Sequence, residues 1–436
     1  MKTEQKLGIY IHLPFCKKKC DYCDFYSISG EKTGKLEEIM NQYQKALLAH
    51  MALLSPSATL FSVDTIYFGG GTPSFYGASR IDALLRAIKK GFCVERTAEI
   101  TVEGNPESVD KKFLQTLRRG GVNRISLGIQ STNHLELSSV GRIHSSEDSR
   151  KAVSLCKSLQ IKNLSLDLIY GLPQQTIESW AETVEEAIAL EPEHISCYGL
   201  KVEEGTALFS RVAQGETLID EDKQAQMYLW TVERLAKAGF LQYEISNFAK
   251  DGYHSRHNLG YWQGKPYLGF GASAASDFGG YRSTLVGDIT AYCDCVLSGG
   301  GQIFSSNQLV GQGERNQEHL MLRLRTNQGI SGQEYERECG LDFLPLSKKL
   351  KEYQKEAWAD CSASGHWHLT AEGYLRSNLL IGELLDVQEE SQEAPSLPLI
   401  EPKPLSTKEE APSPVSPLVL YEEEETGQFC FDPPSS

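Results

Sequence analysis

The chain has no apolar stretch long enough to span a membrane, although it is 436 residues long. A membrane-spanning helix needs about 18 consecutive apolar residues. The opening residues, Met1–Lys6, are polar, and no apolar signal-peptide core follows them. Eleven cysteines, an odd number, are scattered along the chain, which is typical of a reducing compartment rather than of a disulfide framework. We therefore expect a cytoplasmic protein with no membrane span.

Basic residues are also in short supply. The chain has 43 Lys and Arg against 58 Asp and Glu, a formal net charge of −15. Nucleic-acid-binding proteins usually present a basic face, so this balance argues against nucleic acid as a partner. Most of the net negative charge lies in residues 386–436, which hold 12 acidic residues, 2 lysines and 9 of the 17 prolines. A segment this polar and Pro-rich cannot bury a core, so we expect a disordered acidic tail.

Short apolar strands alternate with helical patterns up to about Ser246. Six strand–helix units follow one another, and this order predicts a parallel sheet that curls into an open barrel. The expected strands are Gly8–His12, Val63–Phe68, Ala98–Glu103, Arg124–Gln130, Asn163–Ile169 and His194–Tyr198. Polar residues such as Glu103, Gln130 and Asp167 fall near strand ends, at the edge that holds the active site in parallel barrels.

The sequence thus predicts an α/β fold in three parts. Residues 1–245 are expected to form an open, partial parallel β/α barrel, and residues 246–385 a smaller C-terminal α+β domain. The pattern between residues 318 and 380 favours helices with a β-wing. Winged-helix shapes often bind DNA, but this segment has no basic stripe. The third part is the tail, which we exclude from the fold.

Three cysteines near the N-terminus give the most specific chemical signal. Cys16, Cys20 and Cys23 form a C-x3-C-x2-C run. Three thiolates on one short loop can hold three corners of a cubane iron–sulfur cluster and leave one iron open for chemistry. Structural zinc is the alternative, but it usually takes four ligands. His12 could supply the fourth, although its place between an apolar strand and Leu13-Pro14 favours a packed role.

A glycine-rich run, Gly69-Gly-Gly-Thr-Pro73, directly follows the second expected strand. Glycines there allow the backbone to approach a ligand closely. The run lacks the Gly-Lys-Ser/Thr of a Walker loop and the G-x-G-x-x-G spacing of a dinucleotide fingerprint. Alone it predicts a turn more readily than a site, but its position one strand after the cysteine loop favours a site.

Further motifs follow one another along the chain. They are Tyr10–Cys16, Gly69–Ser74, Glu103–Pro106, Gly128–Ser131, Gly141–His144, Asp167–Pro173, Glu204–Thr206, Tyr243–Phe248 and His257–Trp262. With these motifs the sequence resembles the radical S-adenosylmethionine (SAM) family, in the branch of oxygen-independent coproporphyrinogen oxidase and the haem chaperone HemW. The resemblance extends from Gly8 to Leu385 and leaves out the tail.

The resemblance implies a 4Fe–4S cluster on the three cysteines, with an open iron that takes the amino and carboxylate groups of SAM. The residues that would line the cofactor are Tyr10, Tyr22, Gly71, Thr72, Glu103, Gln130, Arg142, Asp167 and, after the last strand, Gly199. Glu103 can accept from the ammonium or a ribose hydroxyl, Asp167 from ribose hydroxyls, and Arg142 can pair with the carboxylate. The alternative for Arg142 and Asp167 is an ordinary ion pair at the barrel end.

Two features separate the chaperones from the oxidases in this branch. The oxidases have a longer N-terminal arm and a further cysteine two residues after the third, where this chain has Phe25. The chaperones resemble this chain in both respects and share His257-Asn-Leu-Gly-Tyr-Trp262, whose histidine is implicated in holding haem. Imidazole is a common ligand of haem iron, and the alternative for His257 is an internal hydrogen bond. The loop Gly269–Ser276 departs from the family, since a proline, a glycine and a histidine are missing from it.

The resemblance therefore implies a haem chaperone that passes haem to acceptor haemoproteins. Its electron donor is not identified by the sequence, and its C-terminal domain is expected to offer a haem or partner surface. The runner-up is a coproporphyrinogen oxidase of porphyrin biosynthesis, which uses a radical to decarboxylate propionate side chains. A zinc-stabilised binding protein is the third class.

Overall fold

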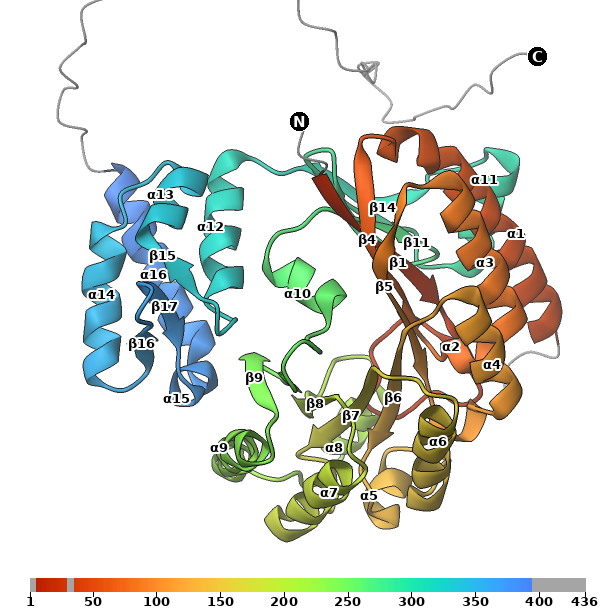
Figure 1. Cartoon of the computed structure of the whole chain (residues 1–436), viewed down its shortest axis with the longest axis horizontal. Coiled ribbons are helices and arrows are strands. Elements are labelled where there is room, and N and C mark those ends of the chain that lie inside the picture. Colours follow the sequence, from red (N-terminus) through yellow and green to blue (C-terminus); the bar gives the residue numbers. More distant parts are fainter. Residues whose placement is uncertain (1–4, 30–34, 394–436) are drawn as a thin grey trace, which may run out of the picture.

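The computed structural model describes residues 5–29 and 35–393 of the chain, and a large open sheet forms its centre (Figure 1). The sheet has 12 strands in the order β14-β13-β12-β11-β1-β4-β5-β6-β7-β8-β10-β9. The strands from β11 to β8 in this order run parallel. They are β11 (Tyr267–Phe270), β1 (Gln5–Leu13), β4 (Phe61–Gly70), β5 (Val94–Gly104), β6 (Arg124–Gln130), β7 (Leu164–Tyr170) and β8 (His194–Gly199). The predicted open parallel barrel is confirmed.

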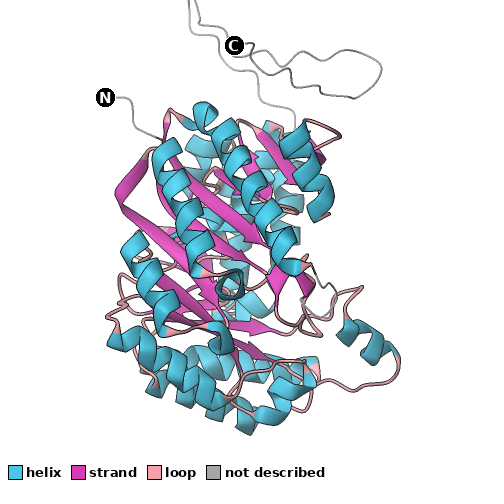
Figure 2. Cartoon of the chain, turned by 90° about the vertical axis from the view of Figure 1, so that its right-hand side faces the viewer, coloured by secondary structure: helices cyan, strands magenta, loops and turns pink. Residues whose placement is uncertain are grey.

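Helices between the strands cover the outer face of the sheet (Figure 2). They are α1 (Leu36–Leu54), α3 (Ala78–Gly91), α4 (Lys111–Gly120), α6 (Ser146–Ser158), α7 (Ile177–Ala189) and α9 (Glu221–Lys237). Local polar contacts fix where they begin: Asp110 caps α4 by accepting from the Phe113 amide at 2.7 Å, and Ser145 forms a capping box at α6. Each buries an apolar stripe against the strands, as Leu114 and Leu117 do on α4. No helix in the described part of the chain is long and apolar enough to cross a membrane.

The inner face of the parallel sheet is polar. Successive residues of a strand point to opposite faces, and the set that includes Ile100, Leu127, Leu166 and Ile195 is buried in the main apolar core. The opposite set on β5 to β8 is Glu99, Thr101, Glu103, Arg124, Ser126, Ser165, Asp167, His194 and Ser196. A closed barrel usually fills its interior with apolar layers. This open barrel instead has an interior that can receive a polar ligand.

Further strands join the same sheet from both sides of residue 245, where the sequence predicts a domain boundary. They are β9 (Leu241–Glu244) and β10 (Asn247–Ala249) at one edge, and β11, β12 (Ala275–Phe278), β13 (Tyr281–Leu285) and β14 (Phe304–Leu309) at the other. β11 pairs with β1, with Gly8 opposite Tyr267. The alternation of strands and helices could not show this pairing, because a late strand returns to the first strand of the chain.

Residues 312–393 form a smaller helical unit with its own three-stranded sheet, β15-β17-β16 (Figure 1). Its elements are α12 (Gln312–Arg323), β15 (Ile330–Ser331), α13 (Gly332–Cys339), α14 (Leu344–Lys355), β16 (Ala359–Cys361), β17 (His366–Leu369), α15 (Ala371–Leu375) and α16 (Ser377–Glu393). Leu320, Tyr335, Leu350, Trp367 and Leu384 belong to a separate buried apolar cluster. A cluster of its own agrees with the predicted α+β domain.

Helix α16 extends past residue 386, where the sequence predicts the start of the disordered tail. That prediction is wrong for residues 386–393. Gln388 is buried, and its side-chain amide donates to the Tyr335 hydroxyl at 2.7 Å, so the end of α16 docks on α13. The acidic composition obscured this contact, because one face of a helix is enough to dock. The rest of the predicted tail, residues 394–436, lies outside the described residues.

Candidate functional site

A cavity of about 480 Å³ lies where the carboxyl ends of the parallel strands meet the loop that follows β1. Its lining includes Cys16, Cys20, Tyr22, Cys23, Gly71, Thr72, Glu103, Gln130, Arg142, Asp167 and Gly199. The structure therefore brings together all the residues singled out from the sequence except Tyr10 and His257. Ligand sites in parallel sheets lie at this same edge.

The cysteine loop is tied to the barrel at both of its ends. Its start, β2 (Phe15–Cys16), pairs with β3 (Ile28–Ser29), and the Phe15 ring packs 5.4 Å from the ring of Tyr43 and 5.2 Å from that of Tyr76. Farther along the loop, Arg211 donates to the Asp21 carboxylate at 2.6 Å. These contacts give three cysteines on a short loop a defined position above the sheet.

The glycine run supports the cysteine loop by close backbone contact. The Gly71 amide donates to the Leu13 carbonyl at 3.0 Å, and the Thr72 amide to the Phe15 carbonyl at 2.8 Å. A Cβ on Gly71 would lie 2.7 Å from the Phe15 nitrogen, closer than real Cβ contacts allow. The close backbone approach expected from these glycines is therefore a contact between two segments of the chain, the glycine run and the start of the cysteine loop.

The three thiols of the loop differ in burial. Cys16 is buried and Cys20 and Cys23 are partly exposed, and the Thr72 hydroxyl donates to the Cys16 sulfur at 3.4 Å. Burial raises the pKa of Cys16, and it raises the pKa of Cys23 to about 11. Metal binding must displace these protons, because thiolates are the ligands. Among the described residues, no three His, Cys, Asp or Glu side chains converge as ligands of a single metal ion. In a cubane cluster each thiolate binds its own iron, so such convergence is not required.

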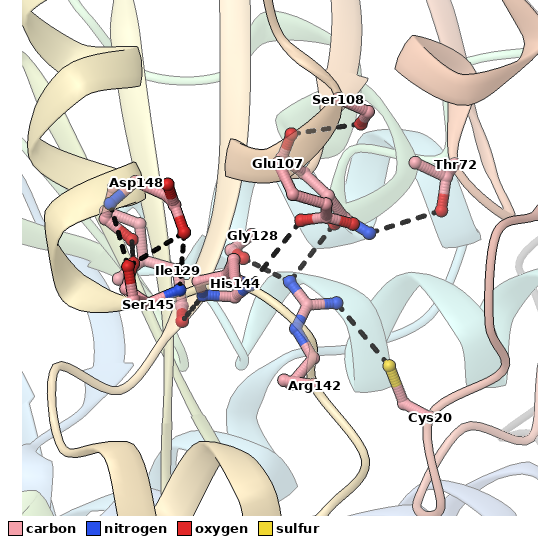
Figure 3. A network of polar contacts seen from close by, with 12 residues as sticks. Cys20, Thr72, Glu107, Ser108, Gly128, Ile129, Arg142, His144, Ser145 and Asp148 are labelled. Carbon is pink, nitrogen blue, oxygen red and sulfur yellow. Dashed lines mark hydrogen bonds and ion pairs between the residues drawn. The ribbon is translucent and has the colours of Figure 1, made fainter.

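Arg142 connects the cysteine loop with the ends of β5 and β6 (Figure 3). Its guanidinium contacts the Cys20 sulfur at 3.5 Å, the Asn105 side-chain oxygen at 3.1 Å and the Gly128 carbonyl. These partners are sulfur, amide and carbonyl atoms, whereas the ordinary ion pair considered from the sequence would need a carboxylate. The next histidine, His144, is buried and bonds the Ile129 carbonyl at 3.0 Å, which fixes the segment that presents Arg142.

Two carboxyl groups face the cavity with hydroxyl donors around them. Glu103 accepts from the Tyr67 hydroxyl at 2.7 Å. Burial raises its pKa to about 7, although the Tyr67 hydrogen bond opposes the shift. Asp167 accepts from Ser126 at 2.8 Å and from Ser196 at 2.8 Å. Burial raises the pKa of Asp167 too, and these hydroxyls oppose that shift. Both carboxyls can accept hydrogen bonds from a ligand.

Gln130 ends β6 in a conformation that few residues adopt. Its φ is 66°, in the left-handed region, and the pairing of β6 with β7 shifts register between Gly128 and Gln130. Such backbone strain is often found at binding sites, where it directs a side chain or a carbonyl. Gly199 ends β8, and a Cβ there would lie 3.0 Å from the Tyr170 hydroxyl. Both strand ends line the cavity.

Tyr10 and His257 are not among the cavity-lining residues; Tyr10 lies on β1 and is partly buried, and His257 packs near β4. The Tyr10 hydroxyl bonds His12 Nδ1 at 2.9 Å, and His12 Nε2 bonds the Tyr26 carbonyl at 3.0 Å, so His12 is packed as predicted. His257 belongs to α10 (Arg256–Trp262) and is buried. The Nδ1 atom of His257 bonds the Thr65 hydroxyl at 3.0 Å.

His257 Nε2 bonds the Tyr261 hydroxyl at 2.9 Å, so both ring nitrogens have protein partners. Burial is the main cause that lowers the pKa of His257 to about 3, and Lys265 and Arg124 act in the same direction. The imidazole is therefore neutral. This arrangement corresponds to the internal hydrogen bonding that the sequence left open as the alternative to a haem ligand.

The divergent loop at residues 269–276 packs on α1 and the end of β1. The Ala272 amide donates to the Tyr43 hydroxyl at 2.9 Å, and that hydroxyl donates to the His12 carbonyl at 2.9 Å. A Cβ on Gly269 would lie 2.0 Å from the Ala275 carbonyl oxygen, so this glycine is required by the tight turn. The loop is not among the segments that line the cavity.

Several lining residues were missed by the sequence reasoning: Tyr67, Asn105, Arg124, Ser126 and Ser196. A signal for some of them was present. In Arg124-Ile-Ser-Leu-Gly-Ile-Gln130, polar or small residues alternate with apolar ones, which is the pattern of a strand with one polar face. The same alternation in β5 and β7 would have indicated a polar barrel interior.

Two sequence profiles match the chain. "Radical SAM superfamily" matches residues 10–187, and "HemN C-terminal domain" matches residues 312–376. The haem chaperone HemW of Mycobacterium tuberculosis H37Rv is 35% identical over 327 residues, covering 75% of this chain and 83% of the relative. The Bacillus subtilis haem chaperone HemW is 32% identical over 382 residues, covering 86% and 98%. The mouse protein "Radical S-adenosyl methionine domain-containing protein 1, mitochondrial" is 32% identical over 414 residues, covering 90% and 91%.

A solved structure shares the fold. Coproporphyrinogen III oxidase (HemN) of Escherichia coli superposes with a TM-score of 0.76 at 24% identity, over 88% of this chain and 90% of that one. The fold and the matched profile are those of the radical SAM superfamily. Within it, the chain belongs to the family of the haem chaperone HemW.

Proposed function

We propose that the cavity holds a 4Fe–4S cluster on Cys16, Cys20 and Cys23, with SAM beside it. The donor set fits, since iron–sulfur clusters are held by cysteine thiolates. The volume fits as well, because about 480 Å³ is within the range of small-molecule sites. The observation that carries the proposal is that three thiols, a guanidinium and two carboxyls from distant parts of the chain line a single cavity.

Arg142 is well placed to hold the carboxylate of SAM. Its Nε is buried without a hydrogen-bond partner in the described chain, and one of its terminal nitrogens contacts the Cys20 sulfur. A guanidinium binds a carboxylate through two parallel hydrogen bonds. Arg142 would thus orient the amino-acid end of SAM against the cysteine loop.

Glu103 and Asp167 would accept hydrogen bonds from the ammonium and ribose groups. Both carboxyls have raised pKa values because they are buried, so a donor that approaches them restores lost solvation and favours the charged form. Gly199 would leave room for the flat base at the end of β8. When bound, the cluster and SAM supply the one-electron chemistry, and the residues of this chain supply binding and orientation.

We further propose that the protein binds haem and passes it to acceptor haemoproteins in the cytoplasm, with reduction of the cluster by a separate donor. The named function of the relatives supports this proposal. Phe25 supports it too: it lines the mouth of the cavity, 60% exposed, where the oxidases have a further cysteine. Ligation of haem iron by His257 would require the imidazole to give up its bond to Thr65 or Tyr261.

A haem titration of the anaerobically reconstituted protein tests the function. We expect a shifted Soret band, transfer of haem to an apo-haemoprotein, and no decarboxylation of coproporphyrinogen with SAM and a strong reductant. Decarboxylation of coproporphyrinogen at the rate of a dedicated enzyme, without haem binding, would contradict the chaperone function and support the oxidase.

His257→Ala tests the ligand separately from the function. His254→Ala is the matched control, since His254 is a half-buried histidine nearby that stacks on Tyr243 at 4.4 Å. Loss of the Soret shift in His257→Ala alone would identify His257 as the ligand. An unchanged Soret band would assign it the internal role.

A further inference from the structure

Arg124 is a buried arginine for which the proposed cofactor site has no use. It is the first residue of β6 and only 1% exposed. Its side chain belongs to the polar inner set of the sheet and lines the cavity. Buried cations are normally paired, because transfer of an unpaired charge from water into the protein is strongly unfavourable.

The Arg124 guanidinium has no protein partner in the described chain. Its Nε is buried and unbonded, and neither terminal nitrogen enters a hydrogen bond or ion pair with a described residue. Arginine has five N–H donors in a planar fork that matches a carboxylate. None of these donors is used by a described residue.

Two carboxylates balance the charge of Arg124 through space, but both are occupied. Glu99 and Asp167 act on it electrostatically. Glu99 accepts from the backbone amides of Arg256 and His257, each at 3.1 Å, and so caps α10. Asp167 accepts from serine hydroxyls on its own strand and both neighbouring strands. The barrel therefore holds the positive charge in place without using its hydrogen bonds.

A second unsatisfied group lies next to Arg124. Thr101 on β5 pairs in register with Arg124, it is 0% exposed, and its hydroxyl has no partner in the described chain. The cavity also reaches Asn258 on α10, so it continues inward beyond the cysteine loop. Unbonded buried polar groups are rare in folded proteins. Arg124 lines the cavity, with Thr101 buried beside it on the same face of the sheet, and this cluster indicates a missing polar ligand group.

We propose that Arg124 binds a carboxylate group of a ligand deep in this cavity. This inference rests on the proposed function for the identity of the ligand, since SAM and haem both carry carboxylates. Arg142 contacts Gly128, four residues beyond Arg124 on β6. Four residues of strand span roughly 13 Å. If Arg142 binds the carboxylate of SAM, Arg124 can bind a second carboxylate. A porphyrin propionate is such a group.

The test compares the reconstituted wild type with Arg124→Gln, Arg124→Lys and Arg119→Gln. Arg119 is an exposed arginine and controls for the loss of one positive charge. Haem and haem dimethyl ester are titrated by the Soret band, and SAM by calorimetry. We expect Arg124→Gln to lower the affinity for haem at least about tenfold, which corresponds to about 1.4 kcal/mol. Haem dimethyl ester should bind the wild type and Arg124→Gln equally weakly. Lysine should restore part of the affinity, because it keeps the charge but not the fork.

The melting temperature of the ligand-free protein separates this role from a structural one. Because Arg124 makes no hydrogen bond with a described residue, Arg124→Gln should keep a melting temperature close to that of the wild type. A fall of several degrees would show that the folded barrel needs the charge, and it would overturn the proposal.

The two ligands distinguish the source of the carboxylate. If Arg124→Gln binds SAM more weakly but haem as tightly as the wild type does, the carboxylate site stands and its ligand is SAM. Affinities for SAM and haem that both stay unchanged would overturn the proposal. If the wild type fails to bind haem, the chaperone function fails independently, and the SAM titration alone then decides the role of Arg124.

Discussion

Replacement of Glu103 by glutamine should stabilise the ligand-free protein above pH 7 and weaken its binding of SAM. Glu103 lies at the end of β5, where burial raises its pKa to about 7 and the hydrogen bond from Tyr67 opposes part of the shift. Glutamine has nearly the same shape, keeps an oxygen that accepts from Tyr67, and has no charge. The change therefore removes a buried charge without opening a cavity.

The expected magnitude follows from the pKa of Glu103. Its ordinary value is 4.5. Between that value and about 7, the folded protein keeps a proton that the unfolded chain has lost, so the free energy of unfolding of the wild type falls as the pH rises. At about 1.36 kcal/mol per pKa unit, the full cost above pH 7 is roughly 3 kcal/mol. Because the carboxyl faces an open cavity, solvent screening reduces this cost, and we expect about 1–2 kcal/mol.

Urea unfolding of the metal-free protein at pH 5 and pH 8 measures the effect. Glu103→Gln should gain stability at pH 8 and much less at pH 5, whereas Glu182→Gln, at an exposed glutamate, should change neither. SAM affinity of the reconstituted protein should fall about tenfold, since a hydrogen bond to a charged acceptor is lost. A Glu103→Gln protein that is less stable than the wild type at pH 8 would refute the argument.

Two further predictions concern packing. Gly71→Ala should displace the cysteine loop, because its Cβ would meet the Phe15 nitrogen at 2.7 Å. We expect a loss of about 1–3 kcal/mol of stability and a lower iron content. Gly382→Ala, in open space on α16, is the control and should lose neither stability nor iron. Truncation after residue 393 should leave the melting temperature nearly unchanged, whereas truncation that also removes Gln388 should lower it, because the contact of α16 with α13 is lost. Calorimetry of both truncated chains, together with iron analysis of the glycine variants, measures these effects, and equal melting of the two truncations would contradict the docking of α16.

Local patterns predicted the elements that lie close together in sequence. The six parallel strands and the helices between them follow from hydrophobic periodicity, which is a property of short windows. The residues at the strand ends, such as Glu103 and Asp167, followed because parallel strands bring their carboxyl ends to one edge. The meeting of the cysteine loop with that edge was predicted for the same reason.

Features that depend on distant pairing were not predictable in this way. β11 pairs with β1, which is more than 250 residues earlier in the chain, and no local pattern specifies that partner. The environment of His257 follows from the same pairing, because Thr65 of β4 and α10 meet only once the sheet is assembled. Periodicity predicts a strand at Arg124, but its missing hydrogen bonds can be recognised only when its neighbours are in place.

The most direct test of the central claim is the iron and sulfide content of the anaerobically reconstituted protein, together with its visible absorption. Cys20→Ser is compared with Cys93→Ser, a change at an exposed cysteine outside the loop. We predict about four irons and four sulfides per chain, as in cysteine-ligated cubanes. The broad cluster absorption should be lost in Cys20→Ser and kept in Cys93→Ser. One zinc per chain with no iron uptake, or full iron content in Cys20→Ser, would contradict the account.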